Sequence, residues 1–334
     1  MINTYTYKNL SWVDLESPTE QEVLTLVEKY HIHTLVGEDI LSEYSRPRIE
    51  RYPDHIYLVL RIPERIRRTP RHHHDIRRYT IEEKEINFVI GRDFIVTAHR
   101  GPIEPIANFA KVFETDSIIA RGKEKNSDKN STNSGTTSGG TSGVGDHAGY
   151  IFYYLMKRLY ARIEDDLESI RQSLMHAEAG IFDGKERRMV EVLSNISREL
   201  TDLKQSSRVH KEVIEAFGPA AQAFFGQDFK YHYVDDIIRQ YGKIHEITSN
   251  NHELLNDLRE TNDSLLSTKQ NEIMQTLTVV ASIIFPLELV TGIFSMNTAY
   301  TPIVGSPHDF TIIMGILIIL TLGMLGYFKY RKWL

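Results

Sequence analysis

One ionisable side chain, Glu288, lies within the most apolar part of the chain, and Ser295, Met296 and Asn297 follow where that apolar segment ends. A carboxylate near the middle of a bilayer costs about 2.5–3.5 kcal/mol on insertion scales, so such a residue usually faces a protein interior or a watery path. Mg2+ binds carboxylates while keeping part of its water, and carboxamide oxygens accept hydrogen bonds from that water. These residue types therefore point to the handling of hydrated cations.

Two apolar segments, residues 277–294 and 310–328, would position these side chains. Each is close to the length that crosses about 30 Å of hydrocarbon. The alternative is a pair of buried core helices in a globular domain. We favour two membrane spans, because the two segments are joined by a short loop and stand together near the end of the chain.

The charges that flank the two spans predict their direction. The external loop, residues 295–309, contains no lysine or arginine, whereas the basic tail, residues 329–334, carries Lys329, Arg331 and Lys332. Lysine and arginine are retained on the cytoplasmic side of a membrane. We therefore expect a multi-pass protein of the cell (inner) membrane, with both termini in the cytoplasm.

Composition excludes several classes of function. The chain has 334 residues and a net charge of −6, which does not suggest a partner made of nucleic acid. It has no cysteine, so it forms no disulfide and no thiolate metal site. No phosphate-binding loop, dinucleotide-binding glycine motif or HExxH motif is present, and we expect neither an enzyme nor an ATP site.

The N-terminal part, residues 1–121, is expected to form a small cytoplasmic α/β domain. The run "IYLVLRI" (56–62) indicates a buried strand, and two alternating apolar segments that flank residues 91–93 indicate a β-hairpin. Ser17 suits the N-cap of a first helix, with Glu20 closing a capping box.

Three further segments follow this domain. Residues 122–147 are rich in Gly, Ser, Thr and Asn and are expected to form a flexible low-complexity linker. Residues 148–227 are expected to form a helical hairpin whose second helix ends at Gly218-Pro219. Residues 228–294 are predicted to form one long stalk helix that continues into the first membrane span.

Five strings carry a resemblance to a known family: "WVDLESPTEQE" (12–22), "LVGEDI" (35–40), "RPRIERYPDHIYLVLRI" (46–62), "FIVTAHRGPIEP" (94–105) and "QNEIMQTLTVVASIIFPLELVTGIFSMN" (270–297). They are similar to strings of the CorA family of divalent-cation channels, and the resemblance covers almost the whole chain. It implies a pentameric funnel in which an α/β cytoplasmic domain and a long α-helical stalk precede two C-terminal transmembrane helices. The first span would line the pore and the second would face lipid.

The first span carries a stripe that suits this role. Steps of three and four residues give a seven-residue repeat, which is the period of helices packed around a common axis. The stripe holds most of the polar side chains of the span, and we expect it to line the pore. Its members are Asn271, Met274, Thr278, Ala281, Phe285, Glu288 and Gly292.

The family ends its first span with Gly-Met-Asn, and here Met296 and Asn297 match while Ser295 replaces the glycine. The resemblance implies that a ring of Asn297 side chains selects the hydrated ion at the pore mouth. The alternative is that Asn297 only caps the turn after the helix. Ser295 adds a Cβ and a hydroxyl where backbones crowd together, which affects ion preference and rate rather than architecture.

Glu288 is a second departure from many family members, which have a small polar residue at the matching position. On the stripe it would face the pore as an inner cation site that responds to pH, because five carboxylates around one axis cannot all stay ionised without a cation. The alternative is a glutamate that is shielded from lipid and bonded between helices.

The resemblance also implies regulation by divalent cations bound between cytoplasmic subunits. The matching acidic residues are Glu38, Asp39, Asp236 and Glu260. Mg2+ accepts carboxylates while it retains several waters, so scattered acids at an interface suffice. The alternative is that these acids form ordinary solvated helix faces.

We therefore expect a homo-oligomeric transporter, a pentamer as the resemblance implies, that takes up Mg2+ along the membrane potential, which supplies about 4.6 kcal/mol per 100 mV for a divalent ion. Its partners are the lipid bilayer and other copies of the chain, and it needs no cofactor beyond divalent cations. Two alternatives stay open: a transporter of Zn2+, Co2+ or Ni2+, with or without proton coupling, and a membrane-anchored cation sensor that does not conduct.

Overall fold

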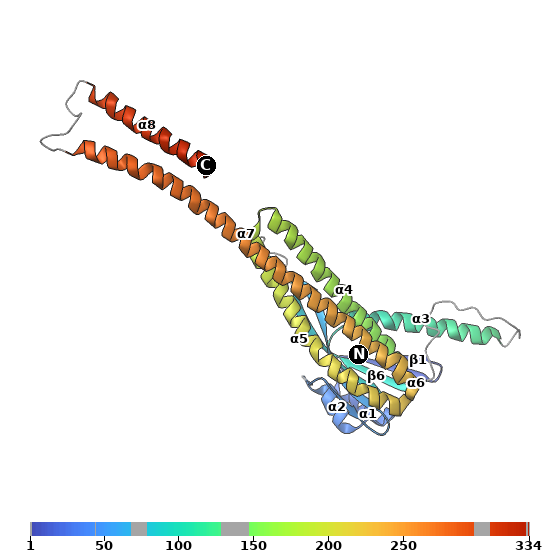
Figure 1. The fold of residues 1–334 in the computed structure, drawn as a ribbon. Coiled ribbons are helices and arrows are strands. Elements are labelled where there is room, and N and C mark those ends of the chain that lie inside the picture. The colour runs from blue at the N-terminus through green and yellow to red at the C-terminus, as the bar shows by residue number, and fades with distance from the viewer. Residues whose placement is uncertain are drawn as a thin grey trace. The chain divides into compact units, whose positions relative to one another are not determined.

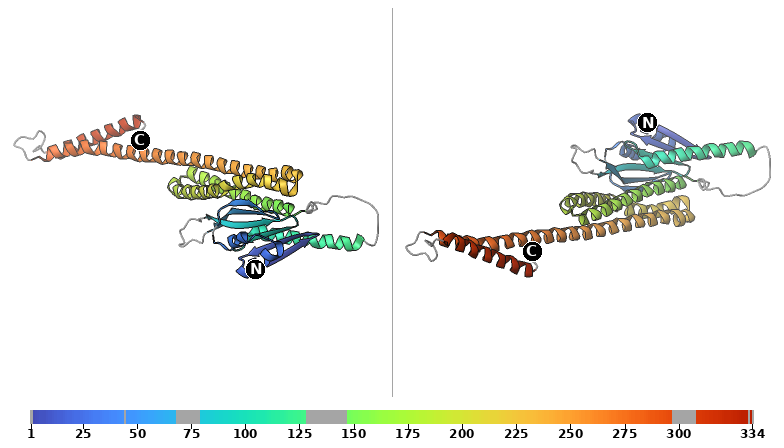
Figure 2. Two further views of the ribbon diagram at one scale, coloured as in Figure 1. Left: turned by 90° about the horizontal axis from the view of Figure 1, so that it is seen from below. Right: turned by 90° about the horizontal axis from the view of Figure 1, so that it is seen from above.

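The computed structural model of the chain forms two compact units; Figure 1 labels many of its elements, and Figure 2 shows the chain from two further directions. The first unit contains Met1–Gly184 and Arg188–Leu258, and the second contains Lys185–Arg187 and Arg259–Leu334. The structure describes residues 2–43, 45–67, 79–127, 147–296, 308–331 and 333. Most of the predicted linker and most of the predicted external loop lie outside these residues.

A six-stranded sheet forms the centre of the first unit, with the strand order β1-β2-β6-β5-β4-β3. Neighbouring strands are antiparallel except for β2 and β6, which run parallel. The strands are β1 (Ile2–Tyr7), β2 (Leu10–Glu16), β3 (Arg48–Arg51), β4 (Ile56–Arg67), β5 (Tyr79–Ile90) and β6 (Phe94–His99). The strand predicted at 56–62 and the hairpin predicted around 91–93 are confirmed.

Helices pack on both faces of this sheet. Successive side chains of a strand point to opposite faces, so each strand contributes to both layers of packing. On one face, Val13 of β2 and Tyr57 of β4 share a core cluster with Val23 of a helix. On the other face, the ring of Phe88 in β5 lies 5.3 Å from the ring of Phe152. The helices of this unit include α1 (Glu20–Tyr30), α2 (Thr34–Leu41), α3 (Glu104–Ser127), α4 (Gly149–Phe182) and most of α5 (Glu186–Phe225).

The first helix begins at a different cap from the predicted one. Thr19, not Ser17, is the N-cap, and its partner in the capping box is Glu22, not Glu20. The Thr19 hydroxyl accepts from the Glu22 N–H at 3.4 Å, and the Glu22 carboxylate accepts from the Thr19 N–H at 2.9 Å. Ser17 is held elsewhere, because its N–H donates to the carbonyl of His99 in β6 at 2.8 Å. Tertiary contact with the sheet therefore overrides the local signal.

Two helices run past the points where sequence patterns predict a boundary. α5 continues to Phe225 with Pro219 inside it, so the predicted end at Gly218-Pro219 is wrong. An interior proline costs about 3 kcal/mol, but Phe217 and Ala221 on either side of it are fully buried, and their packing sustains the helix. α3 continues to Ser127, beyond the predicted domain boundary at residue 121.

The predicted stalk, residues 228–294, corresponds to three consecutive helical segments. They are α6 (Gln227–Phe229), the π-helical turn η1 (Lys230–Val234) and α7 (Asp235–Ser295). Gly226, with a φ of 99°, separates α5 from α6. The long helix is confirmed, and its residues are divided between the two units at Leu258.

The second unit holds two apolar helices, the C-terminal part of α7 and α8 (Asp309–Tyr330), and each is long and apolar enough to cross a membrane. None of residues 310–330 is buried within the chain, and Phe310 and Ile319 are 75% and 73% exposed. Apolar helices with so much exposed surface require apolar surroundings outside the chain, either lipid or other protein.

Candidate functional site

The predicted pore stripe lies on a face of α7 that α8 leaves uncovered. Ser282, one position beyond the stripe residue Ala281, lines a pocket together with residues of α8, and so marks the α8 side of α7. One residue corresponds to about 100° of rotation around a helix. The stripe residues are exposed or half-buried, and they are Asn271, Met274, Thr278, Ala281, Phe285, Glu288 and Gly292.

Glu288 is exposed on this stripe. The Thr291 hydroxyl donates to its main-chain carbonyl at 2.9 Å. Within the part of the chain that the structure describes, the Glu288 carboxylate itself takes part in no ion pair or hydrogen bond. A partner for this carboxylate, whether a cation, a proton or another side chain, must therefore come from outside the described chain.

The predicted filter stands at the end of α7. Ser295 is the last residue of the helix, and Met296 follows it with its N–H donating to the Ile293 carbonyl at 3.3 Å. Met296 is 59% exposed. Asn297 lies outside the described residues, so its predicted role stays a prediction.

Asp39, one of the predicted regulatory acids, forms an ion pair with Arg48 of β3. Arg48 Nε also donates to Glu50 at 2.7 Å, and the Tyr52 hydroxyl donates to the other Glu50 oxygen at 2.7 Å. The bonds from Tyr52 and Arg48 lower the pKa of Glu50, while burial and the bond to Glu50 raise the pKa of Tyr52 to about 12. A divalent cation at Asp39 would have to compete with Arg48.

Asp236, in the first turn of α7, accepts three hydrogen bonds. They come from the Tyr153 hydroxyl at 2.9 Å, Gln240 Nε2 at 2.7 Å and Arg239 at 2.9 Å. Burial by itself would raise the pKa of the Asp236 carboxyl, but these bonds and the charge of Arg239 outweigh burial and lower that pKa. The ionised form, which is the form that binds cations, is therefore favoured.

Glu38 and Glu260 are exposed side chains. Among the described residues, no group of three or more His, Asp or Glu side chains is placed to hold a metal ion. The four predicted regulatory acids are thus not gathered into one metal site within a single chain. A site built from them would need water molecules or acids of a second copy.

Sequence reasoning missed the partners of these acids. No local sequence pattern connects Asp39 with Arg48 or Asp236 with Tyr153. Only the alternation of arginine and glutamate in β3 indicated an ion-pair network. Sequence reasoning also missed the buried carboxylate Asp14, whose Oδ1 lies 3.2 Å from His99 Nε2 and accepts from the Thr97 hydroxyl at 2.5 Å.

A second buried network joins the sheet to two helices. Arg65 at the end of β4 donates from Nε to Glu199 of α5 at 2.7 Å, and from Nη1 to the Ser169 hydroxyl of α4 at 2.7 Å. Its main-chain N–H donates to Asp166 of α4 at 3.2 Å. Arg65 and Glu199 are 8% and 4% exposed, so this network ties the helical hairpin to the sheet in a buried setting.

Comparisons with known proteins agree with this architecture. The sequence profile of the family described as CorA-like Mg2+ transporter protein matches residues 7–331. The cobalt/magnesium transport protein CorA of Thermotoga maritima is 21% identical over 325 residues, which cover 97% of this chain and 83% of the relative.

Two solved structures share the fold. The complete structure of the CorA magnesium transporter from Methanocaldococcus jannaschii aligns with a TM-score of 0.72 and 19% identity, over 98% of this chain and 92% of that chain. The ZntB cytoplasmic domain from Vibrio parahaemolyticus aligns with a TM-score of 0.50 and 11% identity, over 78% of this chain and 88% of that chain. The predicted succession of an N-terminal α/β domain, a long helix and two C-terminal apolar helices is confirmed.

Proposed function

The chain belongs to the CorA-like Mg2+ transporter family, and from this premise we propose that it is a divalent-cation transporter that takes up Mg2+ through a pore between identical subunits. The observation that carries the proposal is the family match over residues 7–331, which includes the long helix and both apolar helices. The membrane potential drives uptake, since a divalent ion gains about 4.6 kcal/mol per 100 mV, so no ATP site is required.

The proposed pore lies on the axis of a homopentamer and is lined by the stripe of α7. Its support is the seven-residue repeat and the exposure of the stripe on a face that α8 leaves uncovered. At the mouth, a ring of Asn297 side chains accepts hydrogen bonds from the water around Mg2+, which spares the ion an unfavourable dehydration. Further in, a ring of Glu288 carboxylates compensates the charge of the ion.

We further propose that both termini lie in the cytoplasm and that α8 faces lipid. The support is the absence of lysine and arginine from residues 295–309 and their presence in the tail 329–334. In the cytoplasm, Asp236 and Asp39 bind divalent cations between subunits and close the pore. The lowered pKa of Asp236 supports a carboxylate that is ready for this role.

A second candidate function is transport of Zn2+, Co2+ or Ni2+, with or without coupling to protons. Two observations favour it: the serine at Ser295 in place of the family glycine, and the ionisable Glu288 on the stripe. A carboxylate ring that exchanges protons for cations would make transport respond to a pH gradient.

Cation influx into liposomes that contain the full-length chain tests the proposal. The liposomes enclose a Mg2+-sensitive dye and carry an inside-negative potential. We expect Mg2+ influx that ignores a pH gradient and that Asn297→Ala reduces by about tenfold or more, the equivalent of about 1.4 kcal/mol. The matched control is Asn250→Ala, which changes an exposed asparagine of the same helix and should leave influx unchanged.

Two other outcomes would change the assignment. Influx of Zn2+, Co2+ or Ni2+ with little Mg2+, steepened by a pH gradient, would favour the second candidate. If no ion enters, the result would contradict transport and favour the membrane-anchored cation sensor. Equal Mg2+ influx through wild type and Asn297→Ala would contradict the selection role of Asn297 while leaving transport itself intact.

A further inference from the structure

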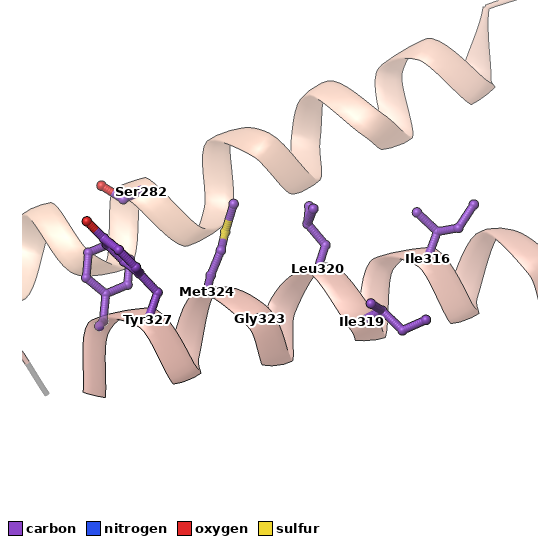
Figure 3. A pocket seen from close by; sticks show the side chains of 8 residues that line it. Ser282, Ile316, Ile319, Leu320, Gly323, Met324 and Tyr327 are labelled. Carbon is purple, nitrogen blue, oxygen red and sulfur yellow. The ribbon is translucent and has the colours of Figure 1, made fainter. Parts of the chain in front are cut away.

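A pocket of about 560 Å3 lies between the two apolar helices of the second unit, α7 and α8. Figure 3 shows Leu320 and Met324 of α8 pointing toward α7, with Ser282 of α7 beside Tyr327. Gly323 forms part of the wall, and a Cβ at this position would meet no atom within 4 Å. The walls are apolar apart from the hydroxyls of Ser282 and Tyr327, so the pocket suits an apolar occupant.

The pocket face of α8 continues into an aromatic and basic rim. Tyr327 and Phe328 line the pocket, and steps of four and three residues from them reach Arg331 on the same face. Arg331 is exposed, and its N–H donates to the Tyr327 carbonyl at 3.0 Å, so helical geometry extends this far. The Trp333 ring stacks on Phe328 with 6.1 Å between the ring centroids.

We propose that this pocket binds an acyl chain of an anionic phospholipid, and that Arg331 holds the phosphate of the same lipid. A guanidinium forms paired, charge-assisted hydrogen bonds with phosphate. Tryptophan and tyrosine prefer the level of the lipid headgroups, which places the rim at the membrane surface. The lipid belongs to the cytoplasmic leaflet, a placement that rests on the topology proposed above and not on the identity of the transported ion.

A second copy of the chain is the competing occupant of the pocket. The predicted membrane spans that such a copy would bring are residues 277–294 and 310–328, and the one carboxylate in them, Glu288, lies six positions beyond Ser282, away from the end of α8 that carries Arg331. An anionic phospholipid brings an apolar chain and an anion together. Anionic lipids are also the species that basic residues next to a membrane span attract, so the charge of the rim favours the lipid.

The chain carries its own reporter for this site. It has two tryptophans, Trp12 and Trp333. Trp12 is fully buried in the core of the first unit, whereas Trp333 is 47% exposed and stacks on a residue that lines the pocket. Phospholipids with brominated acyl chains quench tryptophan fluorescence on contact, so they report occupancy next to Trp333 while Trp12 supplies a constant background.

The test uses the full-length chain in phosphatidylcholine vesicles that contain increasing fractions of brominated phosphatidylglycerol or brominated phosphatidylcholine. We expect half-maximal quenching at a mole fraction of brominated phosphatidylglycerol about fivefold lower than that of brominated phosphatidylcholine. One basic side chain at the membrane surface supplies a selectivity of this size. Arg331→Gln should abolish this preference. Lys329→Gln is the matched control, because Lys329 is the neighbouring base but does not continue the pocket face, and it should retain the preference.

A second pair of variants tests the pocket itself. Gly323→Leu fills the pocket and should reduce quenching by both lipids, whereas Gly326→Leu makes the same change at a glycine of the same helix that does not line the pocket.

Equal quenching by the two lipids in wild type would overturn the role of Arg331. Undiminished quenching in Gly323→Leu would overturn the pocket as the site, and a lack of quenching by either lipid would show that a second copy covers it. None of these outcomes depends on transport.

Discussion

The environment of Glu288 is set by groups outside the single chain, such as lipid, ions or other subunits. Its carboxylate is exposed and has no ion pair or hydrogen bond within the described residues, yet it lies in a segment apolar enough to cross a membrane. A carboxylate in such a place persists only with a cation, a proton or water beside it. The choice between a Mg2+ pore and a proton-coupled transporter therefore rests largely on this position.

Replacement of this carboxylate gives the first prediction at the residue scale. Glu288→Gln keeps the shape of the side chain but removes its charge and its exchangeable proton. With equal pH on both sides of the membrane, we expect influx through wild type to change between about pH 5 and pH 8, and influx through the variant to lose this pH dependence. Glu272→Gln, which changes an exposed acid of the same helix, should keep the wild-type profile. An unchanged profile in Glu288→Gln would rule out a proton-responsive cation site at this residue.

The buried pair of His99 and Asp14 predicts a dependence of stability on pH. His99 donates from Nδ1 to the Gly101 carbonyl at 2.7 Å while Nε2 lies 3.2 Å from Asp14 Oδ1, so protonation of both ring nitrogens is favoured. Burial would lower the pKa of His99, but the hydrogen bond and the charge of Asp14 outweigh it and raise that pKa above 6.5. This stabilisation is complete below the unfolded-state pKa of about 6.5 and is lost as pH rises through the higher folded-state pKa.

We therefore expect His99→Gln to lower the free energy of unfolding at pH 6 by about 1.5–3 kcal/mol, the range for a hydrogen bond to a charged group. The gap between wild type and variant should narrow as pH rises above 6.5. Thermal unfolding of the full chain in detergent, measured across this pH range, gives both quantities. His176→Gln, at an exposed histidine, serves as the control. A gap that widens with rising pH would show that His99 is neutral in the folded state.

At the scale of elements, the turn between α5 and α6 depends on one glycine. Gly226 has a φ of 99°, a backbone conformation in which a Cβ is strained, although no atom lies within 4 Å of the Cβ position. The constraint is therefore conformational rather than steric. It allows the chain to turn from α5 into the segments that lead to α7, the helix that carries the candidate pore stripe.

Alanine at two glycines should therefore have opposite effects. Gly226→Ala should lower the free energy of unfolding by about 1–3 kcal/mol, because alanine rarely adopts a positive φ. Gly242→Ala should raise it by up to about 1 kcal/mol, because Gly242 is exposed inside α7, where alanine favours the helix and meets no neighbouring atom. Thermal unfolding of both variants under identical conditions makes the comparison. A destabilised Gly242→Ala would show that another copy packs against this glycine.

At the scale of the whole molecule, the proposed topology makes a direct prediction. The chain has no cysteine, so single introduced cysteines can be labelled without background. In intact cells, Ser306→Cys should react with a membrane-impermeant maleimide, because residues 295–309 are proposed to lie outside. Lys332→Cys should react only after the membrane is opened. Labelling of Lys332→Cys in intact cells would invert the proposed orientation, and equal labelling of both would contradict two spans.

Features that depend on local composition and period can be predicted from the amino-acid sequence alone. Two apolar segments, the strand at 56–62 and the hairpin around residues 91–93 follow from patterns within a few neighbouring residues. The long helix was predictable for the same reason, because one helical period persists along it. The resemblance to the family then predicted the architecture of the whole chain and candidate roles for Glu288 and Asn297.

The pairing of residues across long stretches of chain, by contrast, depends on how distant elements pack. Arg65 meets Glu199 although 134 positions separate them, and His99 meets Asp14 across 85 positions. The parallel pairing of β2 with β6 likewise joins segments that no local pattern connects. Local period reflects interactions within one element, whereas the choice of partner is made by burial and hydrogen bonding when distant elements pack together. For the same reason Thr19 rather than Ser17 caps α1, because contact with β6 holds Ser17 outside the helix.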